Sequence, residues 1–192
     1  RYPGIYIMHD NARMDPKDYP QAAGTWSGTN GLFFWDELEP AEGSYNWSKI
    51  DSFLAKAWDL GLAPSIGIHI MEGGGGRVPQ WVYTQAGARR LQCTWDMPRY
   101  WDPIFLEKYR NFILALGARY DNDPRLEWIQ TGTGIYGETQ PSTDSDDACI
   151  ASAIAADRPG TDPGGLWVGV VNNISAYYAE AFHNKPVMLQ FV

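Results

Sequence analysis

The sequence predicts an α/β fold in which parallel β-strands alternate with α-helices. Five short apolar runs are separated by segments whose apolar residues recur at helical spacing. The runs are apolar at consecutive positions, which is typical of parallel strands that helices cover. No low-complexity segment or interdomain linker interrupts this order, so residues 1–192 are expected to lie within one domain.

The five expected strands are short and are followed by polar or glycine-rich segments. Residues 11–30 are rich in polar and turn residues, so they are expected to form a loop. The strands are expected at Tyr2–Met8, Gly31–Trp35, Leu62–Ile70, Leu126–Gly134 and Pro186–Val192.

Three longer helices are expected between these strands. The first carries apolar residues from Trp47 to Trp58 and stops at Gly61. The second opens with Asp102 as N-cap and Pro103 at its first position. The third is expected from Trp167 to Phe182.

Composition excludes several function classes. The net charge is −8, the pI is near 4.8, and no basic stripe is present, which argues against a nucleic-acid or anionic-membrane partner. No run of 18 apolar residues occurs, so no membrane insertion is expected. Nine Trp and eleven Tyr are many for this length, and although most are expected in the core, a surplus is typical of a ligand groove.

The residues after the strands favour a β/α barrel over a doubly wound sheet. No G-x-G-x-x-G follows the first strand and no phosphate-binding loop is present. In a β/α barrel the site lies on the loops after the carboxyl ends of the strands. These positions carry His9 and Asp10, then Trp35, Asp36 and Glu37, then His69 and Glu72, then Tyr136 and Glu138, then Gln190. Rings that stack on sugars and polar groups that bind hydroxyls indicate a carbohydrate site.

The stretch GTGIYGETQP, residues 132–141, places one carboxylate, Glu138, among three glycines. A carboxyl group that donates a proton to a bound ligand must be able to reach it, so an uncrowded strand end suits this role. Tyr136 and Trp35 would supply low-dielectric walls that favour its protonated form. The alternative is that Glu138 is a solvated loop carboxylate.

The segment WDELEPAEGSYNWSKIDSFLAKAWDLGLAPSIGIHI, followed by VPQWV, resembles the second and third β/α units of clan A glycoside hydrolases. Family 10 xylanases and family 42 β-galactosidases share the order of a Trp, an E-P-x-x-G segment, a helix, a strand ending near His, and P-x-W. The resemblance covers roughly residues 31–138. It implies a (β/α)8 TIM barrel that hydrolyses β-linked poly- or oligosaccharide with retention.

The resemblance also implies that Glu138, at the end of the fourth strand, is the general acid/base. In these families an Asn that binds the sugar 2-hydroxyl usually precedes the catalytic Glu, whereas Gly137 stands there in this sequence. A catalytically silent barrel that binds glycans or serves in a surface assembly is the rival hypothesis. The expected sugar contacts are Trp35, Glu37, His69, Trp81, Tyr136 and Gln190.

Several of these residues have structural alternatives. His69 and Trp81 could equally be packing residues. Glu37 and Glu39 could form a second catalytic pair, although an E-P turn more often positions the following helix. Gly73–Gly76 is expected to form a mobile rim without strand or helix.

No metal and no cofactor are expected, because no His, Cys or carboxylate cluster has metal-ligand spacing. The acidic run at Asp144, Asp146 and Asp147 could bind calcium, but it lacks a spaced ligand loop and is expected to be a solvated turn.

Cys93 and Cys149 are expected in the loops after the third and fourth strands, which are neighbours on one rim. A disulfide between them is predicted, and it would imply a secreted or extracytoplasmic protein.

A (β/α)8 barrel typically needs about 250 residues, so five strands leave it about three units short. The 192 residues are therefore expected to be the N-terminal portion of a single TIM-barrel catalytic domain that pairs with the remainder of its own barrel. The nucleophile, expected near the end of the seventh strand from the resemblance, would lie outside these residues.

Overall fold

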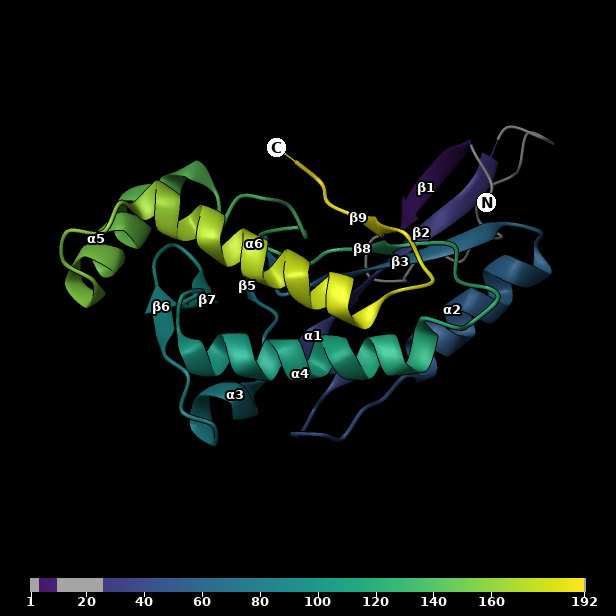
Figure 1. The fold of residues 1–192 in the computed structure, drawn as a ribbon, viewed down its shortest axis with the longest axis horizontal. Helices are drawn as coiled ribbons and strands as arrows, with labels where there is room; N and C mark the ends of the chain where they lie inside the picture. Colours follow the sequence, from purple (N-terminus) through teal and green to yellow (C-terminus); the bar gives the residue numbers. More distant parts are fainter. Residues whose placement is uncertain (1–3, 10–25, 192) are drawn as a thin grey trace.

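The computed structural model describes residues 4–9 and 26–191 and is drawn in Figure 1. The side chain of His9, all of Asp10 and most of the expected loop at 11–30 lie outside the described residues. Within the described part of the chain, no helix is long and apolar enough to cross a membrane.

A five-stranded parallel sheet organises the fold, and its strand order follows the chain. A doubly wound sheet reverses its strand order at a switch point, and no reversal occurs among these five strands. Sequential parallel strands with helical connections are the winding of a β/α barrel. The strands are β1 (Ile5–His9), β2 (Trp26–Phe34), β3 (Ala63–His69), β8 (Ile129–Gln130) and β9 (Val187–Met188).

The largest differences from the expected strand bounds are at the start of β2 and in the fourth and fifth strands, whereas the ends of β1, β2 and β3 shift by one residue. β2 begins at Trp26, so the expectation of a loop through residue 30 was wrong for residues 26–30. Polar Thr29 and Asn30 are buried there and hydrogen-bond to Ile7 of β1 and Gln130 of β8, which a composition-based reading misses. The fourth and fifth strands contain two residues each, although backbone hydrogen bonds from Glu127 N–H to Pro64 and from Thr131 N–H to Met188 extend the contact on either side of β8.

The helices and small sheets occupy the connections between these strands. Gly75–Gly76 pairs with Met71–Glu72, so the expectation that the four-glycine run forms no strand was wrong. The helices are α1 (Trp35–Leu38), α2 (Ser48–Asp59), α3 (Gln80–Thr84), α4 (Pro103–Tyr120), α5 (Asp147–Asp157) and α6 (Pro163–Ala181), with a 3-10 turn at Asp144–Asp146. Two antiparallel hairpins add β4 (Met71–Glu72), β5 (Gly75–Gly76), β6 (Arg90–Gln92) and β7 (Asp96–Pro98).

The two long helices α4 and α6 begin with matching caps and pack against each other (Figure 1). The carboxylate of Asp102 accepts from the backbone N–H of Ile104 at 2.9 Å, and Pro103 follows at the first helical position. Asp162 accepts from Gly165 N–H at 2.7 Å in the same way. These acceptors satisfy backbone N–H groups that a helix N-terminus leaves without partners.

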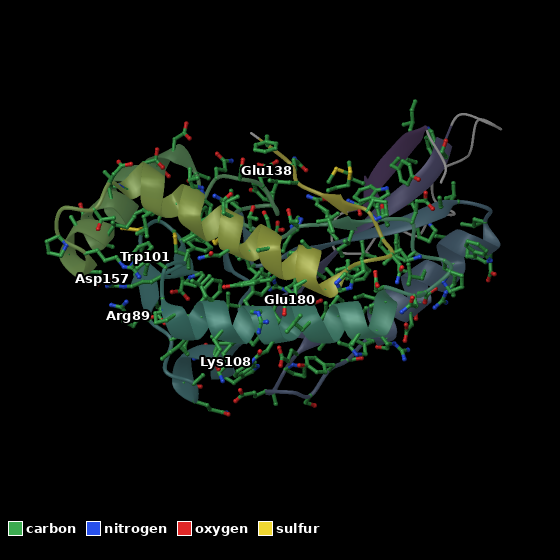
Figure 2. All side chains as sticks on the ribbon, viewed as in Figure 1. Arg89, Trp101, Lys108, Glu138, Asp157 and Glu180 are labelled. Carbon is green, nitrogen blue, oxygen red and sulfur yellow. A yellow bond between two sulfur atoms is a disulfide. The ribbon has the colours of Figure 1, made fainter. Side chains whose placement is uncertain are left out.

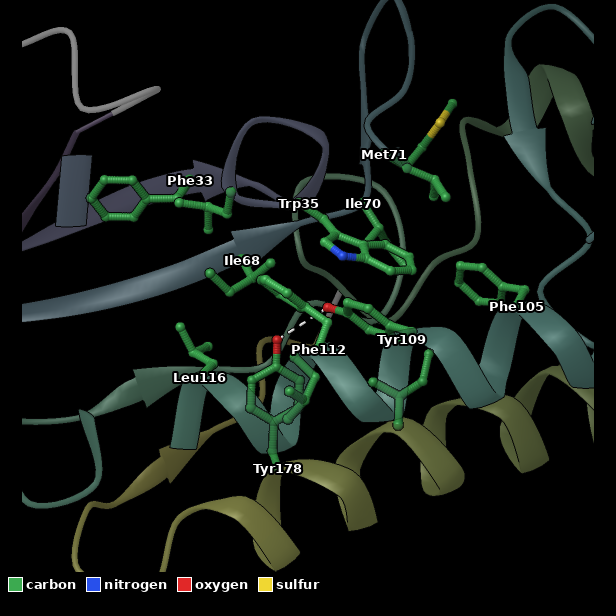
Figure 3. Close-up of a cluster of buried hydrophobic side chains, with 14 of the residues drawn as sticks. Phe33, Trp35, Ile68, Ile70, Met71, Phe105, Tyr109, Phe112, Leu116 and Tyr178 are labelled. Carbon is green, nitrogen blue, oxygen red and sulfur yellow. Dashed lines mark hydrogen bonds between the residues drawn. The ribbon is translucent and has the colours of Figure 1, made fainter. Parts of the chain in front are cut away.

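The strands present one apolar face and one polar face. On the helix side, Phe33 packs edge-on against Phe53 of α2, and Ile66 and Ile68 are fully buried. Figure 3 shows this core continuing to Tyr109 and other residues of α4. Residues one step along the same strands point to the opposite face. There the side chains are mostly polar, and they belong to the candidate site.

A pair of buried tyrosines holds the end of β8 in place. The Tyr109 hydroxyl of α4 donates to the Gly132 carbonyl at 2.9 Å, and the Tyr178 hydroxyl of α6 accepts from Gly132 N–H at 3.1 Å. The two hydroxyls are 3.1 Å apart, and Figure 3 marks their hydrogen bond. Since Tyr109 uses its hydrogen on the carbonyl, Tyr178 donates to Tyr109, and the three bonds form a closed cycle around one glycine.

The loop after β8 contains α5, which is fixed at one end to the β6–β7 hairpin and at the other to residues that flank this hairpin. Cys149 near its start forms the predicted disulfide with Cys93, with a Cα–Cα distance of 5.9 Å. Cys149 lies on the helix rather than in a loop, and Cys93 lies in the hairpin turn. At the other end, Asp157 accepts from Trp101 Nε1 at 2.8 Å and pairs with Arg89 at 3.0 Å (Figure 2).

The acidic run before α5 is structural at its centre. Asp146 is fully buried and accepts from Thr94 N–H at 2.9 Å and from the Ser142 hydroxyl at 2.6 Å. These hydrogen bonds hold the pKa of Asp146 below its usual value, although burial opposes them. The expectation of a solvated turn was therefore wrong for Asp146.

Candidate active site

Glu138 lies in a tight turn beyond the carboxyl end of β8. Its backbone N–H donates to the Ile135 carbonyl at 2.9 Å, and the two residues between them have positive φ. Gly137, with φ of 75°, adopts this conformation freely, whereas Tyr136, with φ of 55°, is strained. Non-glycine residues held in this conformation are found disproportionately at functional sites.

The carboxylate of Glu138 is half-buried and accepts hydrogen bonds from two amides. Gln190 Nε2, beyond β9, donates to Oε1 at 2.6 Å, and Gln140 Nε2 approaches Oε2 at 3.4 Å. The backbone carbonyl of Glu138 accepts from the Thr133 hydroxyl at 2.5 Å. Figure 2 shows Glu138 beside the C-terminal segment that carries Gln190. The turn and the segment after β9 thus hold the carboxylate at the carboxyl edge of the sheet.

A row of polar side chains crosses the inner face of the sheet and ends at Glu138. Gln190 Oε1 accepts from Gln130 Nε2 at 3.2 Å, and Gln130 Oε1 accepts from Asn30 Nδ2 at 2.9 Å. The Ser65 hydroxyl lies 3.2 Å from Asn30 Oδ1. This amide relay, Ser65–Asn30–Gln130–Gln190, joins β3, β2 and β8 to the segment after β9.

His69, the last residue of β3, lies against the same turn. It is 2% exposed, its Nδ1 contacts Glu72 Oε1, and its buried Nε2 has no hydrogen-bond partner. A Cβ added to Gly137 would lie 3.1 Å from the His69 ring, so glycine permits this close approach. The structure therefore brings His69 to the turn that carries Glu138.

Tyr136 also lies at this turn and is 41% exposed. Its backbone N–H donates to the Met71 carbonyl at 3.0 Å, and its hydroxyl lies against Gly73. The glycine run beside β4 thus makes room for the tyrosine. An exposed ring at this edge is placed where a sugar could stack on it.

Trp35 is not a wall of this site, contrary to the expectation. It is 0% exposed and packs against Trp81. Figure 3 shows it against Tyr109 and Phe112 of α4, on the helix side of β2. Trp81 is 4% exposed, and its Nε1 donates to the Glu39 carbonyl at 2.9 Å, so the expectation of a sugar platform was wrong for it too.

The carboxylates after β2 have structural partners. Glu39 is buried and accepts from Trp35 Nε1 at 2.7 Å and from Gly43 N–H at 2.9 Å, and burial raises its pKa. Glu37 is exposed and pairs with Lys49 at 2.5 Å and Arg77 at 3.1 Å. These contacts fit the expectation that the E-P turn positions the following helix. A sugar contact of Glu37 stays a prediction.

Asp36 has the most perturbed carboxyl group near the strand ends. Burial raises its pKa to about 6, and the Arg77 guanidinium at 3.3 Å opposes this shift. Its Oδ1 is buried without a hydrogen-bond partner. Asp36 lines a polar cavity of about 380 Å³ together with Gln80, Arg90 and Asp96.

Sequence reasoning missed the residues of the relay that come before β9. Asn30, Ser65 and Gln130 were read as parts of a loop or of apolar strands. A usable signal was present for Ser65, a polar residue between Pro64 and Ile66 on a strand whose other face is core. Asn30 follows Thr29 and Gln130 precedes Thr131, so neither stands out in the same way. Gln140, which approaches Glu138, follows it by two residues and carried no comparable signal.

Comparison with known proteins gives a family and a fold. The sequence profile of glycoside hydrolase family 42, described as beta-galactosidase, matches residues 21–149. No match was found among curated proteins.

Among solved structures, the chain is similar to a beta-galactosidase from the psychrophilic Marinomonas ef1, with a TM-score of 0.61, 11% identity, and coverage of 98% of this chain and 37% of that one. It is similar to a GH5_18 protein from Streptomyces cattleya in complex with Manβ1-4GlcNAc, with a TM-score of 0.59, 12% identity, and coverage of 97% and 44%. It is also similar to the catalytic domain of a beta-amylase from Paenibacillus polymyxa, with a TM-score of 0.60, 11% identity, and coverage of 83% and 56%.

At these identities the solved structures show the fold, which is that of the TIM-barrel glycoside hydrolases. The chain spans between about a third and just over half of the length of these three structures. The parallel sheet with its sequential strand order agrees with this assignment. Because the family profile covers more than half of the 192 residues, the chain belongs to glycoside hydrolase family 42.

Proposed function

We propose that the protein is a retaining β-glycosidase and that Glu138 is its general acid/base. The observation that carries this proposal is the position of the Glu138 carboxylate. It is half-buried at the carboxyl edge of the sheet, on a strained turn, and two amides approach its oxygens. Active sites of β/α barrels lie at this edge.

The proposed reaction proceeds in two displacements. Glu138 gives its proton to the glycosidic oxygen while a second carboxylate attacks the anomeric carbon, so the C–O bond to the leaving group breaks as the glycosyl–enzyme bond forms. Water then attacks the anomeric carbon, Glu138 takes a proton from that water, and the second carboxylate leaves. Both steps need Glu138 within hydrogen-bond reach of an oxygen at the anomeric centre.

A β-linked galactoside is the first substrate to test, because the matching family profile is described as beta-galactosidase. The complex of the Streptomyces cattleya protein with a mannosyl disaccharide supports a carbohydrate ligand more generally. The exposed ring of Tyr136 and the buried His69 beside the turn are the proposed sugar contacts, and Glu37 after β2 is a third. Gln190 contacts the Glu138 carboxylate itself.

We also propose that further β/α units of the same protein complete the barrel. The chain covers only 37% to 56% of the three solved structures described above, and β1 and β9 each have one strand neighbour among the described residues. A closed barrel removes such edges. The proposed nucleophile would follow the seventh strand of the completed barrel. Export from the cytoplasm is proposed on the basis of the Cys93–Cys149 disulfide.

The test measures sugar release from a panel of β-linked substrates by the purified full-length natural protein. Glu138→Gln should reduce kcat/KM on substrates with poor leaving groups by about 10²–10⁴-fold. Glu180→Gln is the matched control, because this exposed carboxylate on α6 pairs with Arg110 at the surface and lies away from the site (Figure 2).

Hydrolysis by the wild type and by Glu180→Gln, with loss in Glu138→Gln, would support the proposal. Equal activity in all three proteins would refute the role of Glu138. Sugar binding without hydrolysis by the wild type would favour the rival reading, a glycan-binding barrel.

A further inference from the structure

We propose that Gln190 is a positioning residue that selects which oxygen of Glu138 carries the catalytic proton, and that the amide relay behind it fixes its orientation. This inference rests on the proposed function. It assigns to Gln190 an action through Glu138, in place of the direct sugar contact expected from the sequence.

The direction of each hydrogen bond in the relay follows from its end at Glu138. An ionised carboxylate only accepts, so the group of Gln190 that lies 2.6 Å from Oε1 must be its NH2. Gln190 Oε1 then faces Gln130, which must present its own NH2 at 3.2 Å. Gln130 Oε1 in turn accepts from Asn30 Nδ2 at 2.9 Å. One orientation of three amides therefore satisfies the whole row.

The relay is rigid because its inner members are buried and lie on strands. Asn30 on β2 and Gln130 on β8 are buried on the two strands that pair with β3, and Ser65 on β3 is fully buried. Gly67 leaves room for its neighbours, because a Cβ at this position would lie 2.9 Å from Leu32 and 3.3 Å from the Gln130 side chain. Reversing Gln130 would place two oxygens against each other and leave buried donors without acceptors, at a cost of about 1–3 kcal/mol each.

The two oxygens of Glu138 are consequently unequal. Oε1 receives a short bond from Gln190, whereas Oε2 has the longer 3.4 Å approach from Gln140. A protonated oxygen is a poorer acceptor, so the proton sits on Oε2, where it does not weaken the bond to Gln190. Oε2 is then the oxygen that delivers the proton to the leaving group.

The consequence for catalysis depends on the leaving group. A poor leaving group, such as an alkoxide, needs the positioned proton, whereas a dinitrophenolate departs without it. Gln190→Leu should therefore lower kcat/KM for an alkyl β-glycoside by about 10–100-fold, the scale set by misplaced catalytic groups. For the dinitrophenyl glycoside, the same variant should lower kcat/KM, which reports the formation of the glycosyl–enzyme, by less than about threefold.

The experiment compares the full-length wild type with Gln190→Leu, Gln130→Leu and the control Gln85→Leu, an exposed residue at the end of α3. Both glycosides carry the sugar that the wild type hydrolyses. Thermal unfolding identifies any variant that does not fold.

Gln190→Glu is a second variant of nearly equal shape, and its added carboxylate should move the alkaline limb of the kcat/KM profile to higher pH by disfavouring loss of the Glu138 proton.

Three results would support the inference. Gln190→Leu should lose kcat/KM selectively on the alkyl glycoside, and Gln130→Leu should show a smaller loss of the same kind. Gln190→Glu should move the alkaline limb of the kcat/KM profile to higher pH. Equal losses on both glycosides, or an unmoved alkaline limb in a folded Gln190→Glu, would overturn it and leave the proposed function standing. Crystal structures of the wild type and Gln190→Leu give a readout that needs no activity. They should show Glu138 rotated away from its wild-type position, and an unchanged Glu138 would overturn the inference even if the wild type hydrolyses no glycoside.

Discussion

Replacing Tyr178 by Phe opens the hydrogen-bond cycle that fixes the end of β8. The ring stays in place, and only the hydroxyl is removed. Gly132 N–H then loses its acceptor, 3.1 Å away, in a fully buried position. Tyr109 loses the hydrogen bond that it receives from Tyr178.

The magnitude follows from these two losses. A buried N–H without a partner costs about 1–3 kcal/mol, and one lost internal hydrogen bond costs about 0.5–1.5 kcal/mol. Tyr178→Phe should therefore lower the free energy of unfolding by about 2–4 kcal/mol. Tyr109→Phe should cost about 1–3 kcal/mol, because the Gly132 carbonyl loses the 2.9 Å bond.

Urea unfolding of the purified protein measures these changes, with Tyr177→Phe as the control. Tyr177 precedes Tyr178 on α6 and is half-buried, so its change should stay within about 0.5 kcal/mol. The double variant Tyr109→Phe/Tyr178→Phe should lose about 1 kcal/mol less than the sum of the single losses, because the bond between the hydroxyls is counted in both. Additive losses, or a Tyr178→Phe effect no larger than the control, would refute the closed cycle.

The same cycle predicts a loss of stability at alkaline pH. Burial raises the pKa of Tyr109 and of Tyr178 well above the usual value near 10. In the folded state both hydroxyls keep their protons above pH 10, whereas in the unfolded state they release them. Stability is therefore full below about pH 10 and falls as pH rises further, by up to about 1.4 kcal/mol per pH unit for each tyrosine. Tyr178→Phe should reduce this slope.

Gly132→Ala should lower the free energy of unfolding by about 1–3 kcal/mol, because its Cβ would overlap the Ile68 carbonyl. Gly169→Ala on α6 has open space around it and should raise the free energy of unfolding by about 0.5–1 kcal/mol. Equal effects of the two changes in urea unfolding would contradict this packing. Replacing both Cys93 and Cys149 by Ser should cost about 4 kcal/mol in the chain-entropy model for a separation of 56 residues, and an unchanged melting temperature would show that the bond is absent or without effect. The pKa of Asp36 is raised to about 6, so between about pH 4 and pH 6 the folded state holds a proton that the unfolded state releases. The free energy of unfolding should therefore fall as pH rises through this range. Asp36→Asn should flatten this part of the profile of stability against pH, and an unaltered profile would exclude Asp36 as its source.

The fold class was predictable because strand and helix periodicity is a local property of the sequence. The apolar stripe from Phe105 to Leu116 and the cap at Asp102 both appear where they were expected. The start of β2 was not predictable from composition, because Thr29 and Asn30 look like loop residues. Their burial becomes favourable only when other strands of the sheet supply hydrogen-bond partners, which local sequence does not reveal.

The candidate site was predictable where it depends on strand ends. Glu138, His69 and Tyr136 follow strands and meet at one edge of the sheet, as parallel strands require. Trp35 follows β2 equally closely, yet it turns to the helix side. Which face a residue takes in the first turn after a strand depends on the register of that turn, so aromatic character alone did not separate a core ring from a site ring.

The anomeric configuration of the first product tests the central claim most directly. Proton NMR of the full-length protein acting on a β-linked galactoside distinguishes the newly released anomers before mutarotation mixes them. The proposed retaining mechanism with Glu138 as acid/base predicts that the β-anomer appears first, and that Glu138→Gln releases sugar from a poor-leaving-group substrate at least about 100-fold more slowly. Initial release of the α-anomer, or an undiminished rate in Glu138→Gln, would contradict it.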